Sequence, residues 1–565
     1  MKVLGRIKVG LISSVWVSLL FVALSGVVLK VPVVRASGTI YINADGSISP
    51  PNVPISISGN ITYTLTDNIN GSIVVERDKI VIDGNGYTIQ GTGTETGIDL
   101  SGRSNVTIKN MEIQEFGEGI RMLDSSNNSI IENSFQDGGD RGIWLYGSSN
   151  NSISRNNVAN NDHGIWLEYS SNDNSIIGNN VTANTYDGIL LDYSSDNNDI
   201  RENNLEKNFP AIMIDHSSNT NIAGNNVANN TDGIRLFYSS NDSIVGNNVT
   251  ANQFRGIALE GPSSNNILKD NAMARNGYNF GVWGYELTDF MNDVDTSNTV
   301  DEKPIYYLVN VQNLIIDPQT YPDIGYLAVV NSTNITVRNL NIKNNDEGIL
   351  LACTRDSSIE NFTATNNSAG LLVVCSSNNT IAGNNITNNS WGIRFSNSSG
   401  NSISGNNVTA SGWKGIYLSD SSNNRIFHNN FIDNTNQVYS YNSVNVWDNG
   451  YPSGGNYWSD YSGMDLYSGS FQNETGSDCI GDTGSAMDTN NIDNYPLMIP
   501  FGSILGDVNG NGKVEGDDLL LVASHFGKEL GDPDYFRMFD LNGDGYIGID
   551  DIFIAASHFG QEENP

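Results

Sequence analysis

The sequence predicts a mainly-β chain in which a long parallel β-helix is followed by a small α-helical domain at the C-terminal end. Three observations support this fold class. A short phrase, Gly-Ile-x-Leu, recurs at a nearly constant spacing along most of the chain. Polar turns rich in Asn, Ser and Gly separate short β-branched segments within each repeat. Near residue 503 the pattern changes to two similar units, each a polar loop followed by a helix.

The repeat is about 23 residues long. Successive glycines are 22 to 24 residues apart in a first run, where Ala211-Ile212 fills one slot, and 22 or 23 apart in a second run. Self-similarity at a fixed period of this size is typical of a solenoid. Between the runs, residues 276–339 break the period, and we expect them either to form a loop over the helix or to join two stacks. The glycines are Gly119, Gly142, Gly164, Gly188, Gly233 and Gly256, then Gly348, Gly370, Gly392 and Gly415.

Each repeat contains three short apolar segments. Besides the Gly-Ile phrase, one segment follows a polar turn, as at Ser152-Ile153, and one follows an Asn pair, as at Asn157-Val158. The segments are only a few residues long and β-branched, which indicates strands. One unit has no room for a helix, so leucine-rich and ankyrin arrays are excluded. Three strands per turn, stacked turn on turn, make a parallel β-helix, and the recurring Asn residues can satisfy main-chain groups at its turns.

The N-terminus and the composition indicate an exported protein. Lys2, Arg6 and Lys8 precede an uncharged stretch over 9–29, and a small-residue cleavage site follows at 34–36. Residues 1–37 are therefore expected to be a secretory signal or a retained N-terminal membrane anchor. The formal net charge is −35, although only 16% of the residues are charged. This balance excludes nucleic acid as a partner, because binding it requires clustered cations.

Two loops near the C-terminus have the spacing of calcium-binding loops. They lie 33 residues apart, and each places oxygen-bearing residues at positions 1, 3, 5, 7 and 12, with glycine at position 6. A Ca²⁺ ion requires several oxygen ligands, so we expect two ions, one in each loop. The predicted ligands are Asp507, Asn509, Asn511, the Lys513 carbonyl and Asp518, and then Asp540, Asn542, Asp544, the Tyr546 carbonyl and Asp551.

The C-terminal unit over about 504–561 resembles a type I dockerin domain. Position 12 of each loop is Asp rather than Glu, no helix precedes either loop, and nearly the same helix follows both. This resemblance implies calcium-dependent attachment to a cohesin-type partner. Dockerins usually read their partner through loop positions 10 and 11, which here are Gly516-Asp517 and Ile549-Asp550 instead of a hydroxyl pair. The identity of the cohesin therefore stays open.

The repeats over roughly 38–445 resemble the NosD-type family of carbohydrate-binding and sugar-hydrolase β-helices, which are pectate-lyase-like in fold. The resemblance extends to the opening segment 80–86 and to the later segment 454–461. It implies a right-handed, single-stranded β-helix in a secreted or cell-surface protein. One such scaffold hosts many activities, so the resemblance does not assign one. Copper, which the NosD name suggests, has little support, because His and Met are sparse.

One outer face of the predicted β-helix carries acidic and aromatic residues. Counted from each repeat glycine, offsets +1 and +3 are apolar and are expected to point inward, so offsets +2 and +4 face solvent. Offset +4 places three carboxylates on successive coils, about 4.8 Å apart, where they repel one another. These are Glu168, Asp192 and Asp215, and the aromatic residues beside them are Trp144, Trp166 and Tyr146.

This face has several interpretations. Paired carboxylates can act as acid and nucleophile or base in glycoside hydrolysis, and carboxylates with Ca²⁺ and a base such as Arg141 or His163 can serve a polysaccharide lyase. The rings can instead form a sugar-binding platform without catalysis. A solvated acidic strip with incidental aromatic residues is the remaining interpretation. Whether the protein is an enzyme stays open, because no short catalytic motif of pectin hydrolases or lyases is present.

The second run of repeats has apolar residues on its outer face. Leu350, Leu372 and Val374 occupy solvent offsets, which indicates that another segment covers them. Cys353 and Cys375 both fall at offset +5 of neighbouring coils. They form either a disulfide or a pair of unbridged thiols.

Four regions and two functions are therefore expected. The regions are a signal or anchor at 1–37, the β-helix at 38–445, a cap or linker at 446–502, and the dockerin-like domain at 503–565. In the first function, the β-helix binds or processes a polysaccharide and the dockerin attaches it to a cohesin-bearing assembly. In the second, the protein is a structural or adhesive envelope rod with a calcium-stabilised end.

Overall fold

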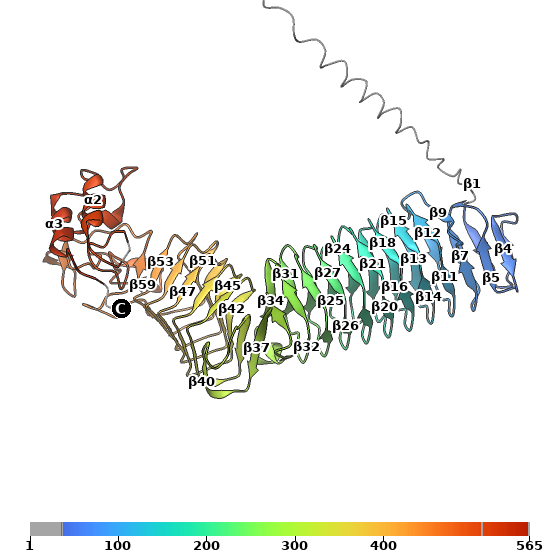
Figure 1. Cartoon of the computed structure of the whole chain (residues 1–565), viewed down its shortest axis with the longest axis horizontal. Coiled ribbons are helices and arrows are strands. Elements are labelled where there is room, and N and C mark those ends of the chain that lie inside the picture. The colour runs from blue at the N-terminus through green and yellow to red at the C-terminus, as the bar shows by residue number, and fades with distance from the viewer. Residues whose placement is uncertain (1–34, 37, 510–511, 563–565) are drawn as a thin grey trace, which may run out of the picture.

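The computed structural model describes residues 35–36, 38–509 and 512–562, and it confirms the predicted fold class. Short strands wind into a long parallel β-helix, and the helices α2 (Gly516–Ser524) and α3 (Ile549–Ser557) lie near the C-terminus. Figure 1 shows an elongated rod that bends between β34 (Tyr278–Trp283) and β42 (Glu347–Ala352). The predicted signal or anchor lies almost entirely outside the described residues. In the described ranges, no helix is long and apolar enough to cross a membrane.

Each coil is built from three strands, as in β17 (Ser152–Ser154), β18 (Asn157–Ala159) and β19 (His163–Glu168). The central residues of these strands, including Ile153 and Val158, are fully buried. Every strand pairs in parallel with its counterpart in the next coil, so identical positions stack along the rod. The apolar side chains of successive coils therefore form one continuous core.

One sheet of the first stack carries the predicted functional face. Its strands follow one another through the coils with register partners 22 to 25 residues apart over most of their length. They are β2 (Ile40–Ile42), β3 (Ile48–Ser49), β7 (Ile73–Val75), β10 (Thr96–Asp99), β13 (Glu118–Leu123), β16 (Arg141–Tyr146), β19, β22 (Ile189–Leu191), β25 (Ile212–Asp215), β28 (Ile234–Phe237), β31 (Arg255–Glu260) and β34.

Ladders of asparagine side chains explain why the sequence is so rich in Asn. At a turn between strands, the main-chain N–H of Asn156 donates to Asn179 Oδ1 at 2.9 Å, and Asn179 Nδ2 donates to the Ile153 carbonyl at 2.9 Å. Both asparagines are only 1% exposed. The side chain thus supplies hydrogen bonds that a buried turn cannot obtain from water. The same arrangement repeats in coil after coil.

The repeat glycine is required by close contact between coils. A Cβ atom at Gly142 would lie 2.6 Å from Val158 Cγ1 and 2.7 Å from the Gly164 carbonyl oxygen. Both distances are shorter than any side chain tolerates, so only glycine allows the strands to pack at this position. Equivalent crowding occurs at Gly164 and Gly233.

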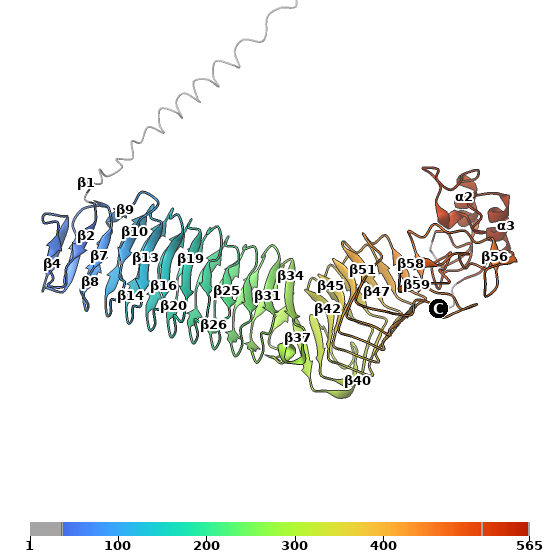
Figure 2. The same ribbon diagram turned by 180° about the vertical axis from the view of Figure 1, so that it is seen from behind.

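The period break joins two stacks rather than forming a loop over the helix. After β34 come the short 3-10 helix η1 (Leu287–Phe290) and β36 (Thr299–Val300), which pairs antiparallel with β37. A new parallel sheet then begins, and β34 and β42 lie side by side at the bend in both views (Figures 1 and 2). The strands of this sheet are β37 (Lys303–Val309), β39 (Tyr326–Val330), β42, β45 (Ala369–Val374), β48 (Trp391–Ser396), β51 (Lys414–Ser419) and β54 (Val438–Tyr441).

The outer face of this second sheet is covered by the end of the first stack. Leu350, Leu372 and Val374 are at most 1% exposed and belong to the same apolar cluster as the core of the first stack. Their inward-facing neighbours, such as Leu351 and Val373, belong to a separate cluster inside the second stack. The second stack therefore closes the open end of the first, and this contact produces the bend.

Two further features stabilise the second stack. Cys353 and Cys375 form a disulfide between neighbouring coils, with their Cα atoms 4.6 Å apart, so the pair is bridged. Beyond the last coil, Trp447 and Trp458 lie buried against the core at the far end of the stack. A segment with the hairpin β58 (Ser485–Asp488) and β59 (Asn491–Asp493) follows before the C-terminal helices.

Candidate functional site

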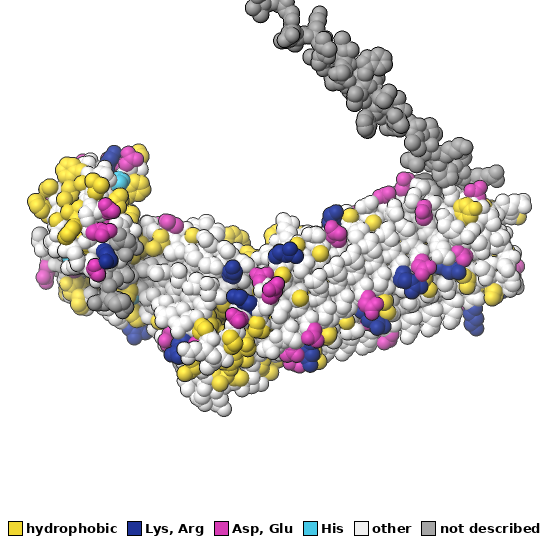
Figure 3. Space-filling model, viewed as in Figure 1, with side chains coloured by type: hydrophobic (Ala, Val, Ile, Leu, Met, Phe, Trp, Pro, Cys, Tyr) yellow, Lys and Arg dark blue, Asp and Glu magenta, His cyan; other side chains and the backbone are white. Residues whose placement is uncertain are grey.

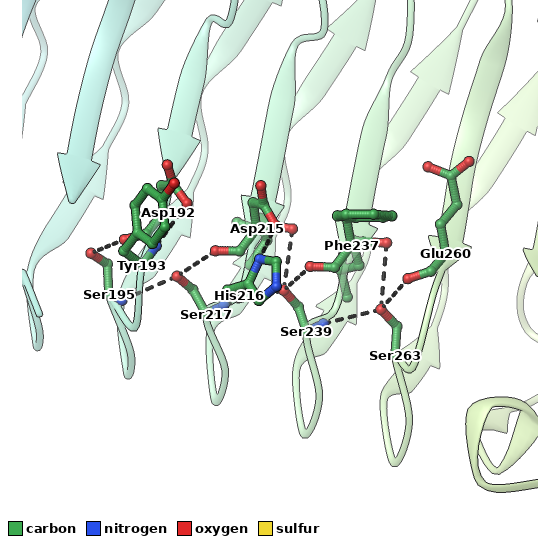
Figure 4. Close-up of polar contacts among 12 residues, drawn as sticks. Asp192, Tyr193, Ser195, Asp215, His216, Ser217, Phe237, Ser239, Glu260 and Ser263 are labelled. Carbon is green, nitrogen blue, oxygen red and sulfur yellow. Dashed lines mark hydrogen bonds and ion pairs between the residues drawn. The ribbon is translucent and has the colours of Figure 1, made fainter. Parts of the chain in front are cut away.

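The three predicted carboxylates lie in one column on the outer face of the first stack. Glu168 ends β19, Asp192 directly follows β22, and Asp215 ends β25. A ladder of buried serines lies beneath this edge, where the N–H of Ser195 donates to Ser217 Oγ at 3.0 Å and the N–H of Ser217 donates to Ser239 Oγ at 3.3 Å (Figure 4). These bonds hold successive turns in register, so the carboxylates are stacked.

Burial changes the protonation of this column. The pKa of Glu168 is raised by burial, against the opposing effect of the Arg141 charge. The pKa of Asp192 is raised to about 6, chiefly by burial and then by repulsion from Asp215. The Asp215 carboxylate lies 2.5 Å from His216 Nδ1. Glu168 and Asp192 therefore keep a proton more readily than solvent-exposed carboxyl groups do.

The two predicted tryptophans enclose an arginine. Trp144 and Trp166 are register partners on β16 and β19, and the Arg141 guanidinium lies 4.3 Å from the centroid of each ring. Both indoles are half-buried. Arg141 therefore occupies the space between the two ring faces, which leaves less ring surface for a sugar than the sequence suggested.

An exposed row of rings lies next to the carboxylates, and the sequence reading missed it. We call Tyr169, Tyr193, His216 and Tyr238 the aromatic ladder. Tyr169 and Tyr193 stack at 5.0 Å, His216 and Tyr238 stack at 4.8 Å, and Tyr146 extends the row at 4.8 Å from Tyr169. The three tyrosines of the ladder are between 42% and 53% exposed. Because the rings stack on one another, they present edges and hydroxyl groups to solvent.

A sequence signal for the ladder exists. All four residues stand at offset +5 from the repeat glycine or alanine, directly after the carboxylate column. Each has a positive φ, between 45° and 51°, which ends the strand. The side chain therefore no longer follows the alternation between the two faces of the sheet. Recurrence of aromatic residues at this offset was visible, but the period-two rule of strands assigns no direction to a residue with such a backbone.

The two C-terminal loops have matching geometry. Asp507 Oδ2 and Asp540 Oδ2 each accept the N–H of the loop glycine, Gly512 or Gly545, at 2.8 Å. Both glycines have positive φ, 82° and 84°, which provides the sharp turn that a calcium loop needs. The first carboxylate and the glycine of each loop therefore have the same arrangement.

The carboxylates at position 12 face into these loops. Asp518 and Asp551 are fully buried, and each accepts a main-chain N–H from position 3 of its loop at 3.1 Å, from Asn509 and Asn542 respectively. Asp544 accepts a hydrogen bond from Asn542 Nδ2. Lys513 and Tyr546 follow the loop glycines and form short bridges to other segments. Asn511 lies outside the described residues.

The donor set fits a hard cation. Burial raises the pKa values of Asp540 and Asp551, and repulsion from neighbouring carboxylates adds to the effect. A Ca²⁺ ion relieves such crowding, and all the predicted ligands are oxygen atoms. In the described parts of the chain, groups of three or more His, Cys, Asp or Glu side chains nowhere gather as a metal site.

The helices that follow the loops expose apolar residues at equivalent positions. Leu520 and Phe553 are 68% and 64% exposed, and the pair Phe526 and Phe559, also 33 residues apart, is similarly exposed. His525 and His558 are equivalent as well, and each places Nδ1 2.9 Å from a carbonyl oxygen of its own helix. Paired apolar residues on a small domain indicate a surface for another protein.

The fold and the loops define a class of protein: a right-handed parallel β-helix with a C-terminal dockerin domain. A family model for the "right handed beta helix region" matches residues 40–205, and the "dockerin type I domain" model matches residues 505–554. The model described as "periplasmic copper-binding protein (NosD)" matches residues 171–305 and 284–463, which together exceed half of the chain. The chain therefore belongs to the NosD family.

Comparison with individual proteins adds similarity of a more distant kind. No curated protein matches the chain. Among solved structures, a mutant of the periplasmic alginate epimerase AlgG is 15% identical, covering 57% of this chain and 83% of its own, with a TM-score of 0.30. The mannuronan C-5 epimerase AlgE4 A-module of Azotobacter vinelandii is 13% identical, covering 66% and 91%, with a TM-score of 0.22. A GH87 α-1,3-glucanase catalytic unit from Streptomyces thermodiastaticus is 12% identical, covering 73% and 70%, with a TM-score of 0.25. Similarity at this level assigns no activity to the chain.

Proposed function

We propose that this protein binds a polysaccharide along the outer face of β19, β22 and β25, and that its dockerin domain attaches it to a cohesin-type partner outside the cell. The observation that carries the first part is the parallel course of the carboxylate column and the aromatic ladder over consecutive coils. Carboxylates accept hydrogen bonds from sugar hydroxyls, and phenolic groups donate or accept them. A surface that repeats with every coil suits a polymer that also repeats.

The predicted tryptophans extend this face at one end. Trp144, Trp166 and Tyr146 lie on the coils that precede Asp192, in the same sheet. Their half-buried rings and the guanidinium of Arg141 provide an amphipathic edge against which a sugar ring can pack. We assign these residues a supporting role and the exposed ladder the larger share of the binding energy.

Binding of a panel of soluble polysaccharides to the full-length protein tests the proposal. The Tyr169→Ala/Tyr193→Ala variant is expected to weaken binding at least tenfold. The matched control, Arg201→Ala/Lys207→Ala, removes surface side chains from the other two sheets near the same coils and should bind as the parent does. Unchanged binding in the tyrosine variant contradicts the proposal. A Trp144→Ala/Trp166→Ala variant measures the contribution of the half-buried rings.

Cleavage of the polysaccharide is a second candidate function. Its supporting observation is the pKa of about 6 for Asp192 beside the Asp215 carboxylate, which is paired with His216. A carboxyl group with a raised pKa beside a second carboxyl group is the arrangement that glycoside hydrolysis uses. Release of new reducing ends or of unsaturated products, lost in Asp192→Asn, would establish hydrolase or lyase activity. No release from any polysaccharide of the panel would leave binding alone.

The second part of the proposal depends on the C-terminal domain. Dockerin and periplasmic-type NosD regions together support a location outside the cytoplasm, at the cell surface. Two Ca²⁺ ions, one in each loop, hold α2 and α3 so that Leu520 and Phe553 stay exposed for the partner. Retention on an immobilised cohesin in Ca²⁺, with release by a chelator, tests this assignment. A panel of cohesins that all fail to retain the protein would contradict it.

A further inference from the structure

A cleft of about 250 Å³ opens where the outer faces of the two stacks meet. We call it the elbow cleft. Figure 3 shows acidic and basic side chains gathered at this junction. Its walls are formed by Arg255, Glu260 and Trp283 of the first stack and by Asp346, Glu347 and Arg394 of the second. The cleft exists only because the period break places β34 next to β42.

Arg394 is held in this cleft without an acidic partner. Its guanidinium lies 5.4 Å from the centroids of Trp283 and Trp391 and 5.5 Å from that of Tyr417. Within the described residues, the Arg394 side chain donates no hydrogen bond and forms no ion pair, and its Nε is buried without a partner. Burial lowers the pKa of the guanidinium. A half-buried guanidinium whose donors lack partners is costly, so the arrangement favours an anionic ligand.

An acceptor in the same cleft also lacks a partner. Asp346 is 8% exposed, and its Oδ2 accepts a hydrogen bond from Arg255 Nε at 2.8 Å. Its Oδ1 is buried and accepts no hydrogen bond from any described residue. A hydroxyl group of a ligand can satisfy this oxygen, and folded proteins rarely leave such an atom unsatisfied.

The charge of the cleft is compatible with an anion. Glu347 Oε2 accepts hydrogen bonds from Tyr326 Oη at 2.9 Å and from the N–H of Val282 at 3.3 Å. Burial, and then repulsion from Asp346, raises the pKa of Glu347. Glu347 thus tends to keep its proton, while Glu260 lies 2.5 Å from Arg235 and 3.5 Å from Arg255. Glu260 and Asp346 are thus paired with arginines. Glu347 acts on Arg394 through its charge but forms no ion pair with it in the described residues, so the donors of Arg394 stay available to a ligand.

We propose that the elbow cleft is a binding site for one hexuronate residue of an acidic saccharide. The sugar carboxylate accepts hydrogen bonds from the Arg394 guanidinium, whose planar donors match a carboxylate in geometry. A sugar hydroxyl donates to Asp346 Oδ1, and Trp283, which lines the cleft, packs against the sugar ring. The volume is below the roughly 300–1,000 Å³ typical of sites for drug-sized ligands, which suits a single sugar unit. The site is separate from the face on β19–β25 and does not depend on it.

Titration of the full-length protein with trigalacturonate, followed by tryptophan fluorescence and calorimetry, tests the proposal. The matched ligand is the trimethyl ester of trigalacturonate, which keeps every hydroxyl and removes the charge. We expect saturable binding of the acid, with at least tenfold weaker binding of the ester. This comparison uses the unaltered protein, so it does not depend on whether any variant folds.

Three variants locate the site that binds trigalacturonate. Arg394→Gln is expected to lose at least tenfold in affinity for the acid and to leave the ester unchanged, and Arg394→Lys should not restore full affinity because it lacks the planar pair of donors. Arg201→Ala/Lys207→Ala removes two cationic side chains outside both proposed sites and should bind trigalacturonate as the parent does. The proposal would be overturned by any of three results: equal affinity for acid and ester, absence of saturable binding, or an Arg394→Gln variant that binds like the parent.

Discussion

Arg255 Nε lies 2.8 Å from Asp346 Oδ2, although 91 residues of sequence separate the two side chains. Main-chain hydrogen bonds accompany this pair, from the N–H of Asn279 to the Asn344 carbonyl at 2.7 Å and from the N–H of Asp346 to the Phe280 carbonyl at 2.9 Å. Together they join the last coil of the first stack to the first coils of the second. The bend is therefore held by specific contacts in addition to apolar burial.

Replacement of Arg255 should destabilise the protein. Arg255→Gln leaves Asp346 buried beside Glu347 without its cation, and breaking a buried ion pair on one side typically costs about 3–5 kcal/mol. Urea denaturation is expected to show this loss. Arg155→Gln is the matched control, since Arg155 and its partner Glu132 are both exposed, and such a pair contributes about 0–1 kcal/mol. Equal midpoints for the two variants would contradict the role assigned to Arg255.

Calcium binding should be divided between the two C-terminal loops. The full chain is expected to bind two ions by calorimetry in chelator-treated buffer, and Asp507→Ala or Asp540→Ala should each remove one. The first carboxylate of a loop supplies a ligand and also fixes the loop glycine through a 2.8 Å hydrogen bond. Asp534→Ala, an exposed change in the same domain, serves as the control and should still bind two. A stoichiometry unaffected by either loop variant would exclude these loops as the sites.

Asp242 should make stability depend on pH. It occupies a buried position where most other coils have Asn, its Oδ1 accepts the N–H of Thr220 at 2.7 Å, and burial raises its pKa to about 8. The folded protein thus keeps a proton that the unfolded chain releases near pH 4. The contribution of this proton to the free energy of unfolding is fully present below about pH 4. It is lost at about 1.4 kcal/mol per pH unit as the pH rises toward 8.

Asp242→Asn is therefore expected to stabilise the protein at pH 7 and to remove that part of the pH slope. Thermal unfolding of both proteins between pH 4 and pH 8 measures the difference. Asn266→Asp is the reverse change in the next coil, at a residue with no exposed surface, and should introduce a slope of the same sign. Parallel profiles for the parent and Asp242→Asn would show that Asp242 carries no shifted proton in the folded state.

The disulfide predicts a specific thiol count. Without reductant, the described residues of the folded protein offer only Cys479 for alkylation, and burial raises the pKa of its thiol to about 11, so labelling should be slow. After unfolding in reductant, three thiols should react. Because the bridge closes a separation of 22 residues, Cys353→Ser/Cys375→Ser is expected to lose about 3 kcal/mol of stability. Cys479→Ser provides the control, and three reactive thiols before reduction would contradict the bridge.

Much of the fold could be predicted because its determinants are local and repeat. Most coils carry their own buried Ile or Val, their own turn asparagine and their own repeat glycine, so one unit read correctly predicts the others. The calcium loops are equally local, since twelve consecutive residues contain the carboxylates and the glycine that the site needs. The carboxylate column also follows from the period alone.

The rest depended on contacts that no local pattern contains. Side-chain packing places Arg141 between Trp144 and Trp166. A positive φ at one turn position exposes Tyr169 and Tyr193. Period-two alternation describes strands and fails at the residue where the strand ends. The aromatic ladder was therefore visible as a recurrence but had no predicted direction.

By itself, the sequence determined a β-helix with a regular interior, a column of acidic residues, and a C-terminal dockerin domain whose two loops have the spacing of calcium loops. Tertiary structure alone decided that the period break makes a bend, that the second stack closes the first, and that Arg394 and Asp346 meet in one cleft. The physical reason is that repeated short-range contacts are encoded within each unit. The joint between two solenoids depends on burying an apolar face against a segment far away in the chain, and the repeat period contains no information about that contact.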